Sequence, residues 1–310
     1  MFAIPPVFAD TDKFPEKPMR MIVPLAPGGG SDIVARMIAA PLSDRWGQPV
    51  VVDNRPGAGS TVGTSMAAKA LPDGYTVMVS SSSMAISPAL HRKLDFDMRR
   101  DFAPVTLLAS QPSVLAVHPS VKAKNIRELV ALAKAQPGKL AYGSAGVGSA
   151  THLGSELFRV SAQLDLLHVP YKSAGLATTA AISGEVQILL TNMASALPQV
   201  KAGRLRGLGV TSSKRSLLAP EMPTVAEAGV PGFEYATWYG MVVPAATPQK
   251  RIARMHAGTL AVLNAPDMRA RMQGRGLEIH GTSEQDFGRY LTTELARWQR
   301  VVKAAGIQQQ

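Results

Sequence analysis

Two glycine-rich segments carry residue types that could bind an anion. The first is Ala26-Pro27-Gly28-Gly29-Gly30-Ser31-Asp32, and the second, GSAGVGSAT, runs from Gly143 to Thr151. Glycines leave backbone N–H groups uncovered and allow positive φ, and a helix that follows adds the positive end of its dipole. Each segment therefore predicts an anion site. The alternative is a tight turn in which nearby side chains cap the following helix, namely Ser31 or Asp32 in the first segment and Ser144, Ser149 or Thr151 in the second.

Neither segment matches the common nucleotide-binding motifs. The residue three after Gly30 is Ile33, so the spacing is not G-x-G-x-x-G, and no Gly-Lys-Ser/Thr follows the glycines. Triphosphate binding is therefore poorly supported. One residue favours a dinucleotide, because Asp53 ends a predicted strand about 20 residues further on, where a ribose-binding acid would stand. A nucleotide-dependent enzyme that uses the Gly28–Gly30 loop stays open as an alternative.

The side chains that do acid–base, nucleophilic or metal chemistry are missing where they would be expected. The loops at the predicted strand ends, 26–31, 80–87, 143–151 and 191–195, contain no charged side chain. No serine lies in G-x-S-x-G, the six histidines form neither H-x-x-H nor H-E-x-x-H, and cysteine is absent. His152 stands out only because it follows the second glycine segment. We therefore expect no catalysis, no metal and no cofactor, and a site that holds an anion through neutral dipoles.

Repeated strand–loop–helix units must position these loops. Short apolar strands at 21–25, 49–53 and 75–80 alternate with helices at 31–46 and 60–70, and a second such series runs from 105 to 211. This alternation predicts an α/β fold with parallel sheets, in which ligands bind at the carboxyl ends of the strands. Two series in 310 residues favour two domains whose glycine loops face one cleft. A long helix over 283–305 should bury one apolar face, formed by Phe287, Leu291, Leu295, Trp298 and Val302.

Composition and charge narrow the class of protein. The net charge is +11, yet Lys and Arg are scattered and no run of five basic residues occurs, so we expect no nucleic-acid partner. No window reads as a membrane span. Val7-Phe8-Ala9 resembles the end of a signal peptide, although the charged and apolar regions that should precede it are missing. We expect a mature exported protein with a short leftover or vector-derived head, and the alternative is an ordinary N-terminus.

Several segments together resemble the periplasmic substrate-binding receptors of tripartite tricarboxylate transporters, the Bug receptors. They extend from about Phe14 to Ile307 and read PLAPGGGSDIVAR, VVVDNRPGAGS, DFAPVTLLA, LAYGSAGVGSATHLGSELF, HVPYKS, LRGLGVTSSKRS, MPTVAEAGVPGFE and TWYGMVVPA. The resemblance implies a two-lobed, type II-like flytrap that closes on its ligand, with two doubly wound sheets joined by hinge strands near 105–117 and 235–243. Lobe 1 would comprise 1–104 and 225–310, and lobe 2 would comprise 105–224, with the ligand cleft between them.

The resemblance also implies a set of binding residues. In this family a ligand carboxylate is held by the first glycine loop and, from the other lobe, by the second. Carried over, this places on one side Pro27, Gly28, Gly29, Gly30, Ser31 and Asp32, and on the other Ser144, Gly146, Gly148, Ser149 and Thr151. The variable part of the site would be lined by Ser81, Ser82, Tyr171, Thr191 and Asn192, and Trp238 would form the wall on the hinge side.

The implied function is capture of an organic carboxylate for a tripartite tricarboxylate-type transporter. Its partners would be the membrane subunits of that transporter, and we expect a monomer in the periplasm. Family members that take amino acids often have Asp where Thr191 stands, so a ligand without an ammonium group is expected, such as a di- or tricarboxylate or an aromatic acid. A solute receptor for a membrane sensor is a further alternative, because it would use the same closing cleft.

Overall fold

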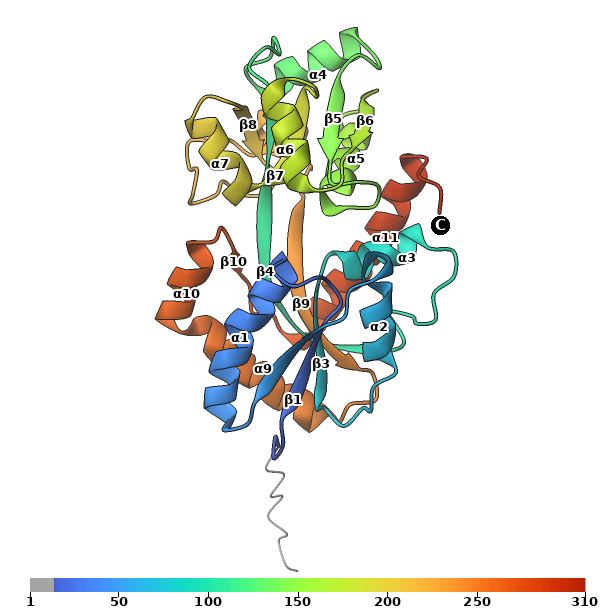
Figure 1. Cartoon of the computed structure of the whole chain (residues 1–310), viewed down its shortest axis with the longest axis vertical. Coiled ribbons are helices and arrows are strands. Elements are labelled where there is room, and N and C mark those ends of the chain that lie inside the picture. The colour runs from blue at the N-terminus through green and yellow to red at the C-terminus, as the bar shows by residue number, and fades with distance from the viewer. Residues whose placement is uncertain (1–13, 310) are drawn as a thin grey trace, which may run out of the picture.

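The computed structural model describes residues 14–309, so Val7-Phe8-Ala9 lies outside the described residues. Two α/β lobes are stacked along the long axis of the molecule and are joined by two long neighbouring strands, β4 (Phe102–Val117) and β9 (Ala236–Pro244) (Figure 1). These strands run antiparallel, from Phe102 opposite Pro244 to Pro112 opposite Ala236. The predicted two-lobed α/β fold is confirmed.

The first lobe is built on strands β1 (Met19–Val23), β2 (Val50–Asn54) and β3 (Thr76–Ser81), which lie side by side with β9 and β4 in the order β2-β1-β3-β9-β4. β1 is parallel to both β2 and β3, whereas β9 is antiparallel to β3. A two-residue strand, β10 (Glu278–Ile279), pairs with β4. The helices of this lobe are α1 (Gly30–Trp46), the 3-10 turn η1 (Ala58–Ser60), α2 (Thr61–Ala68), α3 (Ser83–Leu90), α9 (Gln249–Asn264), α10 (Pro266–Gln273) and α11 (Glu284–Ala304).

The second lobe repeats this plan on a smaller scale. Its strands are β5 (Ala141–Ser144), β6 (Leu167–Pro170), β7 (Ile188–Asn192) and β8 (Arg206–Val210). β5 is parallel to β6 and β7, and the far half of β4 pairs antiparallel with β7 and β8. Its helices are α4 (Ile126–Ala135), α5 (Ala150–Ser161), α6 (Ala174–Ser183), α7 (Met193–Lys201) and α8 (Val225–Ala228).

The sheets are mixed, not purely parallel as the sequence predicted. The reason is β4, which pairs antiparallel with β9 in the first lobe and with β7 and β8 in the second. Its middle residues, Ser-Gln-Pro-Ser, resemble a turn when read alone, because Pro lacks a backbone donor. In the structure, Pro112 lies opposite Ala236 and the strand continues through it into the second lobe. One strand therefore serves as an antiparallel member of both sheets.

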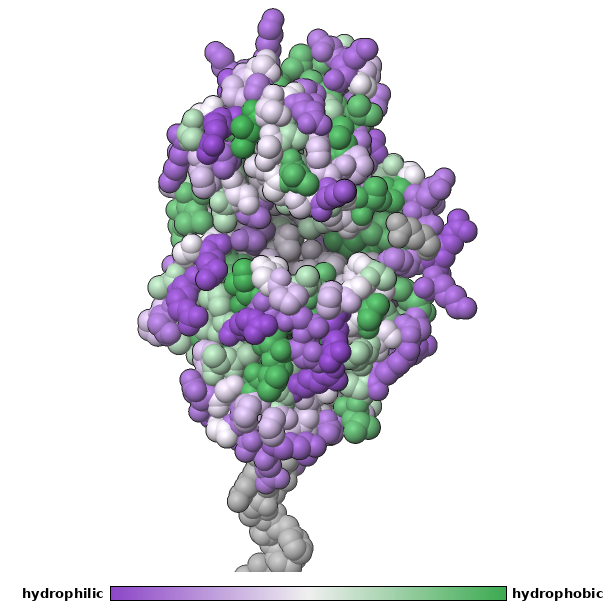
Figure 2. Space-filling view, viewed as in Figure 1, coloured by the Kyte–Doolittle hydropathy of each residue, from purple (hydrophilic) through white to green (hydrophobic). Residues whose placement is uncertain are grey.

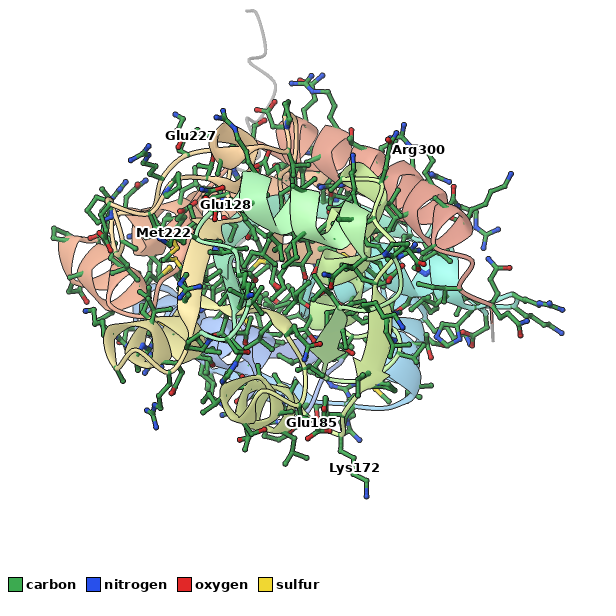
Figure 3. The ribbon with its side chains drawn as sticks, turned by 90° about the horizontal axis from the view of Figure 1, so that it is seen from above. Glu128, Lys172, Glu185, Met222, Glu227 and Arg300 are labelled. Carbon is green, nitrogen blue, oxygen red and sulfur yellow. The ribbon has the colours of Figure 1, made fainter. Side chains whose placement is uncertain are left out.

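Helix α8 lies with the second lobe, whereas the sequence assigned residues from 225 onward to the first. It packs against β8 and α4. Seen from above, Glu227 of α8 and Glu128 of α4 lie at the same side of that lobe (Figure 3). A capping box fixes the start of α8, since Thr224 and Glu227 accept each other's backbone N–H. The residue boundaries of the two lobes otherwise stay a prediction.

The predicted apolar face of the C-terminal helix is confirmed. Phe287, Leu291, Leu295, Trp298 and Val302 are all buried in one core cluster. α11 packs along α3 and β4 of the first lobe and also reaches α5 of the second. It therefore supports the linking strands from behind, away from the loops at the strand ends.

Candidate ligand-binding cleft

The carboxyl ends of the parallel strands in both lobes point toward the space between them. β1 and β3 approach from the first lobe, and β5 and β7 approach from the second (Figure 1). The molecular surface forms a hollow between the two lobes (Figure 2). A cavity of about 420 Å³ lies here, and both lobes contribute to its lining, including Gly28, Gly30 and Tyr239 from one lobe and Asn192 and Ser195 from the other. This is where ligands of open α/β sheets bind.

The first glycine loop leaves the start of α1 uncapped. The helix begins at Gly30, its N-cap is Gly29 in extended conformation, and no side chain accepts from its first turn. Ser31 does not act as the predicted cap, and its buried Oγ has no hydrogen-bond partner. First-turn N–H groups of a long helix attract an anion, and here a buried hydroxyl without a partner lies beside them.

Asp32 shapes this loop instead of facing a ligand with a free charge. Its Oδ2 accepts from the Gly28 backbone N–H at 2.9 Å, and its Oδ1 accepts from Arg36 Nε at 2.9 Å. Burial raises the pKa of Asp32, but the hydrogen bonds from Arg36 and Gly28 outweigh it, so the pKa lies below its usual range. The carboxylate is neutralised within the first lobe. Pro27 is exposed at the tip of the same loop.

Gly30 is required by a close neighbour. A Cβ at this position would overlap the hydroxyl of Tyr239, a residue of the linking strand β9. Gly28 needs glycine for a different reason, because its φ is +79°. A Cβ at Gly29 would meet nothing closer than the Ala26 carbonyl at 3.4 Å. The glycine loop is thereby docked onto a strand that runs between the lobes.

The serine segment after β3 is the start of a helix, although its sequence predicts a loop. The loop predicted at 80–87 is replaced by α3, which begins at Ser83 with Ser82 as its N-cap. Pro88 within the helix and the run of serines hid it, because both residue types disfavour helix interiors. Ser81 is bonded to Ser83, whereas the buried hydroxyls of Ser80 and Ser82 have no partner.

The second glycine loop is largely held by its own side chains. Ser149 caps α5 by accepting from the His152 N–H at 3.2 Å, and Thr151 Oγ1 accepts from the Ala145 N–H at 2.9 Å. Ser144 Oγ accepts from the Gly146 N–H at 3.1 Å. Gly148 and Gly146 both have positive φ. Capping, the alternative left open for Ser149, is thus realised, and any contact of this loop with a ligand stays a prediction.

A stack of aromatic rings behind this loop was not foreseen as a unit. The rings of His152 and His168 lie 4.1 Å apart, and Tyr142 stacks on His168 at 4.9 Å. His152 Nδ1 accepts from the Gly148 N–H at 3.1 Å, and His168 Nε2 lies 2.7 Å from Ser144 Oγ. Burial, followed by the charge of the neighbouring His168, lowers the pKa of His152 to about 4. The stack therefore holds the loop through neutral imidazoles.

The end of β7 holds two predicted residues, of which one lines the cavity and the other is buried beside it. Asn192 lines the cavity, and its side chain caps α7 by accepting from the Ser195 N–H at 2.9 Å. Thr191 is fully buried, and its Oγ1 has no hydrogen-bond partner. Thr191 therefore repeats on the second lobe the condition of Ser31, Ser80 and Ser82 on the first.

Two predicted residues do not present their polar atoms to the cleft. Trp238 is fully buried in the core, where its Nε1 donates to Glu294 Oε2 at 2.9 Å, so it does not form the predicted wall. Its neighbour Tyr239 lines the cavity, because successive strand residues point to opposite faces. The Tyr171 hydroxyl donates to Glu185 at 2.7 Å, and Glu185 projects outward at the edge of the lobe (Figure 3).

The residue that favoured a nucleotide is engaged elsewhere. Asp53 forms ion pairs with Arg20 at 2.5 Å and with Arg55 at 2.9 Å. Burial raises the pKa of Asp53, but these two arginines more than compensate and lower it. A ribose hydroxyl would have to displace one of them. Within residues 14–309, no cluster of three metal-ligating side chains is found, and no helix is both long and apolar enough to cross a membrane.

One charged side chain in the cleft was not predicted. Arg275 lines the cavity from the loop between α10 and β10, and it is the one charged residue among the described residues of that lining. The predicted site consists of loops at strand ends, whereas this loop follows a helix. Its sequence, Gly274-Arg275-Gly276, gave no local signal that it folds back onto the cleft.

Comparison with protein families and known proteins gives a consistent result. Residues 34–307 match the model of the tripartite tricarboxylate transporter family receptor. The chain is 36% identical over 304 residues to the protein BugT of Bordetella pertussis, covering 97% of this chain and 92% of BugT. It is 37% identical over 292 residues to a protein from the tcbD–tcbE intergenic region of Pseudomonas sp. strain P51, covering 94% and 87% of the two chains.

Solved structures with similar folds include two with bound carboxylates. The R. palustris protein Rpa4515 with adipate superposes with a TM-score of 0.81 at 34% identity, covering 96% of this chain and all of that one. MatC from Rhodopseudomonas palustris with bound malate gives a TM-score of 0.77 at 30% identity, covering 93% of this chain and 100% of MatC. The periplasmic binding protein BugD gives 0.78 at 30% identity, covering 96% and 100%.

Proposed function

Because the chain belongs to the tripartite tricarboxylate transporter receptor family, we propose that it is a periplasmic solute-binding protein that captures an organic carboxylate in the cleft between its lobes. It would deliver this ligand to membrane subunits of a tripartite tricarboxylate-type transporter. The family consists of binding receptors, and the cleft offers backbone N–H groups and hydroxyls in place of catalytic side chains. The protein therefore holds its ligand and does not transform it.

One observation carries this proposal: buried hydroxyls without partners lie at the start of α1, at the end of β3 and at the end of β7, so that both lobes contribute them. Ser31, Ser80, Ser82 and Thr191 account for all but one of the buried side-chain atoms that lack a hydrogen bond in the described chain. An unsatisfied buried polar group costs about 1–3 kcal/mol. Ser31 and Thr191 are the immediate neighbours of Gly30 and Asn192, which line the cavity, and a ligand that accepts hydrogen bonds there explains these unpaired groups better than packing does.

The chemistry of the cleft favours an anion without an ammonium group. The uncapped start of α1 and the hydroxyls can all donate to a carboxylate. Asp32 is bonded to Arg36 and Gly28, and Thr191 supplies no negative charge, so neither offers a free carboxylate to an ammonium group. Adipate and malate, which are bound by two similar proteins, are dicarboxylates of this kind. We propose a di- or tricarboxylate as the ligand class, ahead of an amino acid.

A thermal-shift screen tests the proposal. Adipate, malate, other di- and tricarboxylates, aromatic acids, amino acids and NAD are each added in excess, since a ligand that binds the native state raises Tm by mass action. We expect a carboxylate without an ammonium group to raise Tm and NAD to leave it unchanged. A shift with NAD and with no carboxylate would overturn the receptor assignment, and a shift with amino acids alone would overturn the ligand class.

A matched pair of variants locates the site. Gly29→Asp should abolish carboxylate binding, because a negative charge then occupies the anion position at the start of α1. Gly29→Ala is the control, since Gly29 has an ordinary φ of −76° and its Cβ has room. Calorimetric titration should show near-normal affinity for Gly29→Ala and no measurable binding for Gly29→Asp at unchanged fold. Equal affinity of the two variants would mean that the loop is merely a turn.

A further inference from the structure

Arg275 differs in kind from the other groups in the cleft. It lines the same cavity as Gly28 and Gly30, and it introduces a formal positive charge into a lining that is otherwise neutral among the described residues. Its side chain is exposed, and no described carboxylate forms an ion pair with it. Several other arginines, such as Arg20, Arg36 and Arg159, are paired with acids.

The backbone around Arg275 is held in place by both lobes. The Arg275 carbonyl accepts from Gln111 Nε2 at 3.0 Å, and Gln111 belongs to the linking strand β4. Gly276 has a φ of +70°, and its Cα packs so that a Cβ would lie 3.9 Å from Met193 and 3.2 Å from Leu218 of the second lobe. The loop therefore sits where the two lobes meet, next to the helix that follows Asn192.

The position of Gln111 connects this loop to the first glycine loop. Gln111 Oε1 lies 3.5 Å from the Tyr239 hydroxyl, a long contact, and Tyr239 is the residue against which Gly30 is docked. A ligand group near Gly30 and a ligand group near Arg275 would thus lie on opposite sides of the contact between the Gln111 and Tyr239 side chains. The cavity of about 420 Å³ is of the size that small-molecule ligands occupy.

We propose that Arg275 binds the second carboxylate of a dicarboxylate ligand and so decides between dicarboxylates and monocarboxylates. This inference rests on the proposed function, in which the first carboxylate lies at the start of α1. An arginine guanidinium matches a carboxylate with two parallel N–H donors, whereas the neutral groups around Gly30 cannot neutralise a second charge. The first carboxylate is held by dipoles, and the second is held by a full charge.

The test compares ligands of equal length that differ in one carboxylate. Adipate is paired with hexanoate and succinate with butyrate, and affinities are measured by calorimetry or by thermal shift for the wild-type protein, Arg275→Gln and Arg271→Gln. Arg271 is the control because it is an exposed arginine of α10 that does not line the cavity, so both variants lose one positive charge. Arg275→Lys is added to separate charge from the geometry of the guanidinium.

We expect the wild-type protein to bind a dicarboxylate more tightly than its matched monocarboxylate, and Arg275→Gln to lose about 10- to 100-fold in dicarboxylate affinity, which is the value of a hydrogen bond to a charged group. Monocarboxylate affinity should not change, and Arg271→Gln should behave as wild type. Equal losses of affinity for the dicarboxylate and the monocarboxylate would overturn the role of Arg275 while leaving the proposed function in place. A preference for dicarboxylates that survives in Arg275→Gln would do the same. Failure of the wild-type protein to bind any carboxylate would overturn the proposed function and this inference with it.

Discussion

At the residue scale, four buried hydroxyls without partners lower the stability of the fold, and the proposed ligand would supply what they lack. Ser31, Ser80, Ser82 and Thr191 are each at least 98% buried, yet none makes a side-chain hydrogen bond. Removing a hydroxyl that has no partner should therefore leave the fold as stable as before or slightly more stable. Removing a hydroxyl that stabilises the fold would instead lower the stability. If these hydroxyls bind the ligand, their removal should lower the affinity for the ligand without lowering the stability of the protein.

Gly30 provides a prediction about fit. Gly30→Ala should displace the Tyr239 hydroxyl from its contact with the loop and destabilise the protein by about 1–3 kcal/mol, as overpacking does. Carboxylate binding should weaken as well, because the start of α1 moves. Denaturant unfolding measures the first effect and calorimetry the second. The double variant Gly30→Ala/Tyr239→Phe should recover only part of the stability, because a Cβ at position 30 would still lie 2.9 Å from the ring carbon Cζ, and no recovery at all would mean that the hydroxyl does not contribute to the clash.

The sequence predicted the chemistry of the site better than the roles of single side chains. That both loops offer glycine backbone and hydroxyl groups can be read directly from the residue types and their order in the sequence. Tyr171 and Trp238 could not be judged in the same way, because their polar atoms are engaged by Glu185 and Glu294, which are 14 and 56 residues away in the chain. Arg275 was missed for the same reason, since folding alone brings it to the cleft.

At the element scale, the helices that begin at the cleft differ in capping. α5 is capped by Ser149 and α7 by Asn192, whereas α1 and α3 have no side-chain cap. The free N–H groups and the positive end of the dipole are thus concentrated on the first lobe. For the proposed anion, this asymmetry predicts that the first lobe would supply most of the attraction and that the second lobe would supply shape and the Thr191 hydroxyl.

The start of α5 should make stability depend on pH. His152 is neutral in the fold, with its pKa lowered to about 4 by burial and by His168, while Glu156 and Arg159 also face it. Between pH 6.5 and about 4 the unfolded chain therefore binds more protons than the folded chain, and stability falls as pH falls through this window. Protonation also removes the acceptor for the Gly148 N–H. The second glycine loop should loosen with it.

Thermal unfolding between pH 7 and 4.5 measures this effect. We expect the drop in Tm over that range to be smaller in His152→Gln than in the wild-type protein, although His152→Gln starts from a lower Tm because a packed ring is lost. Parallel curves for the two proteins would show that His152 does not contribute to the dependence of stability on pH.

Elements with strong periodicity were predicted well, and elements defined by tertiary pairing were not. The long helix near the C-terminus displays its buried face directly in the sequence. α3 contains serines and Pro88, which weaken the local helix signal, and its formation depends on packing against α11. β4 continues through Pro112 because the neighbouring strand β9 runs beside it there, with Ala236 opposite Pro112. Such pairings are not visible in local sequence.

At the scale of the whole molecule, two strands connect the lobes, and a buried anchor ties one of them to α11. β4 and β9 carry the connection, and Glu294 of α11 accepts from both Trp238 Nε1 at 2.9 Å and Trp298 Nε1 at 3.0 Å. This anchor fixes β9 near the end that faces the second lobe, where Trp238 lies opposite Ser110 of β4. The two-lobed fold was predictable, since two series of strand–helix units appear in order along the chain.

The central claim is that one anion is held by both lobes at once. Calorimetric titration of the wild-type protein and of Thr191→Val with the same dicarboxylate tests it most directly, because Thr191 belongs to the second lobe and its hydroxyl has no partner within the protein. We predict one ligand per chain in both proteins, with binding to Thr191→Val weaker by about tenfold or more and a Tm that is no lower. Equal affinity in the two proteins would contradict the claim, since the second lobe would then contribute no hydrogen bond from this strand end.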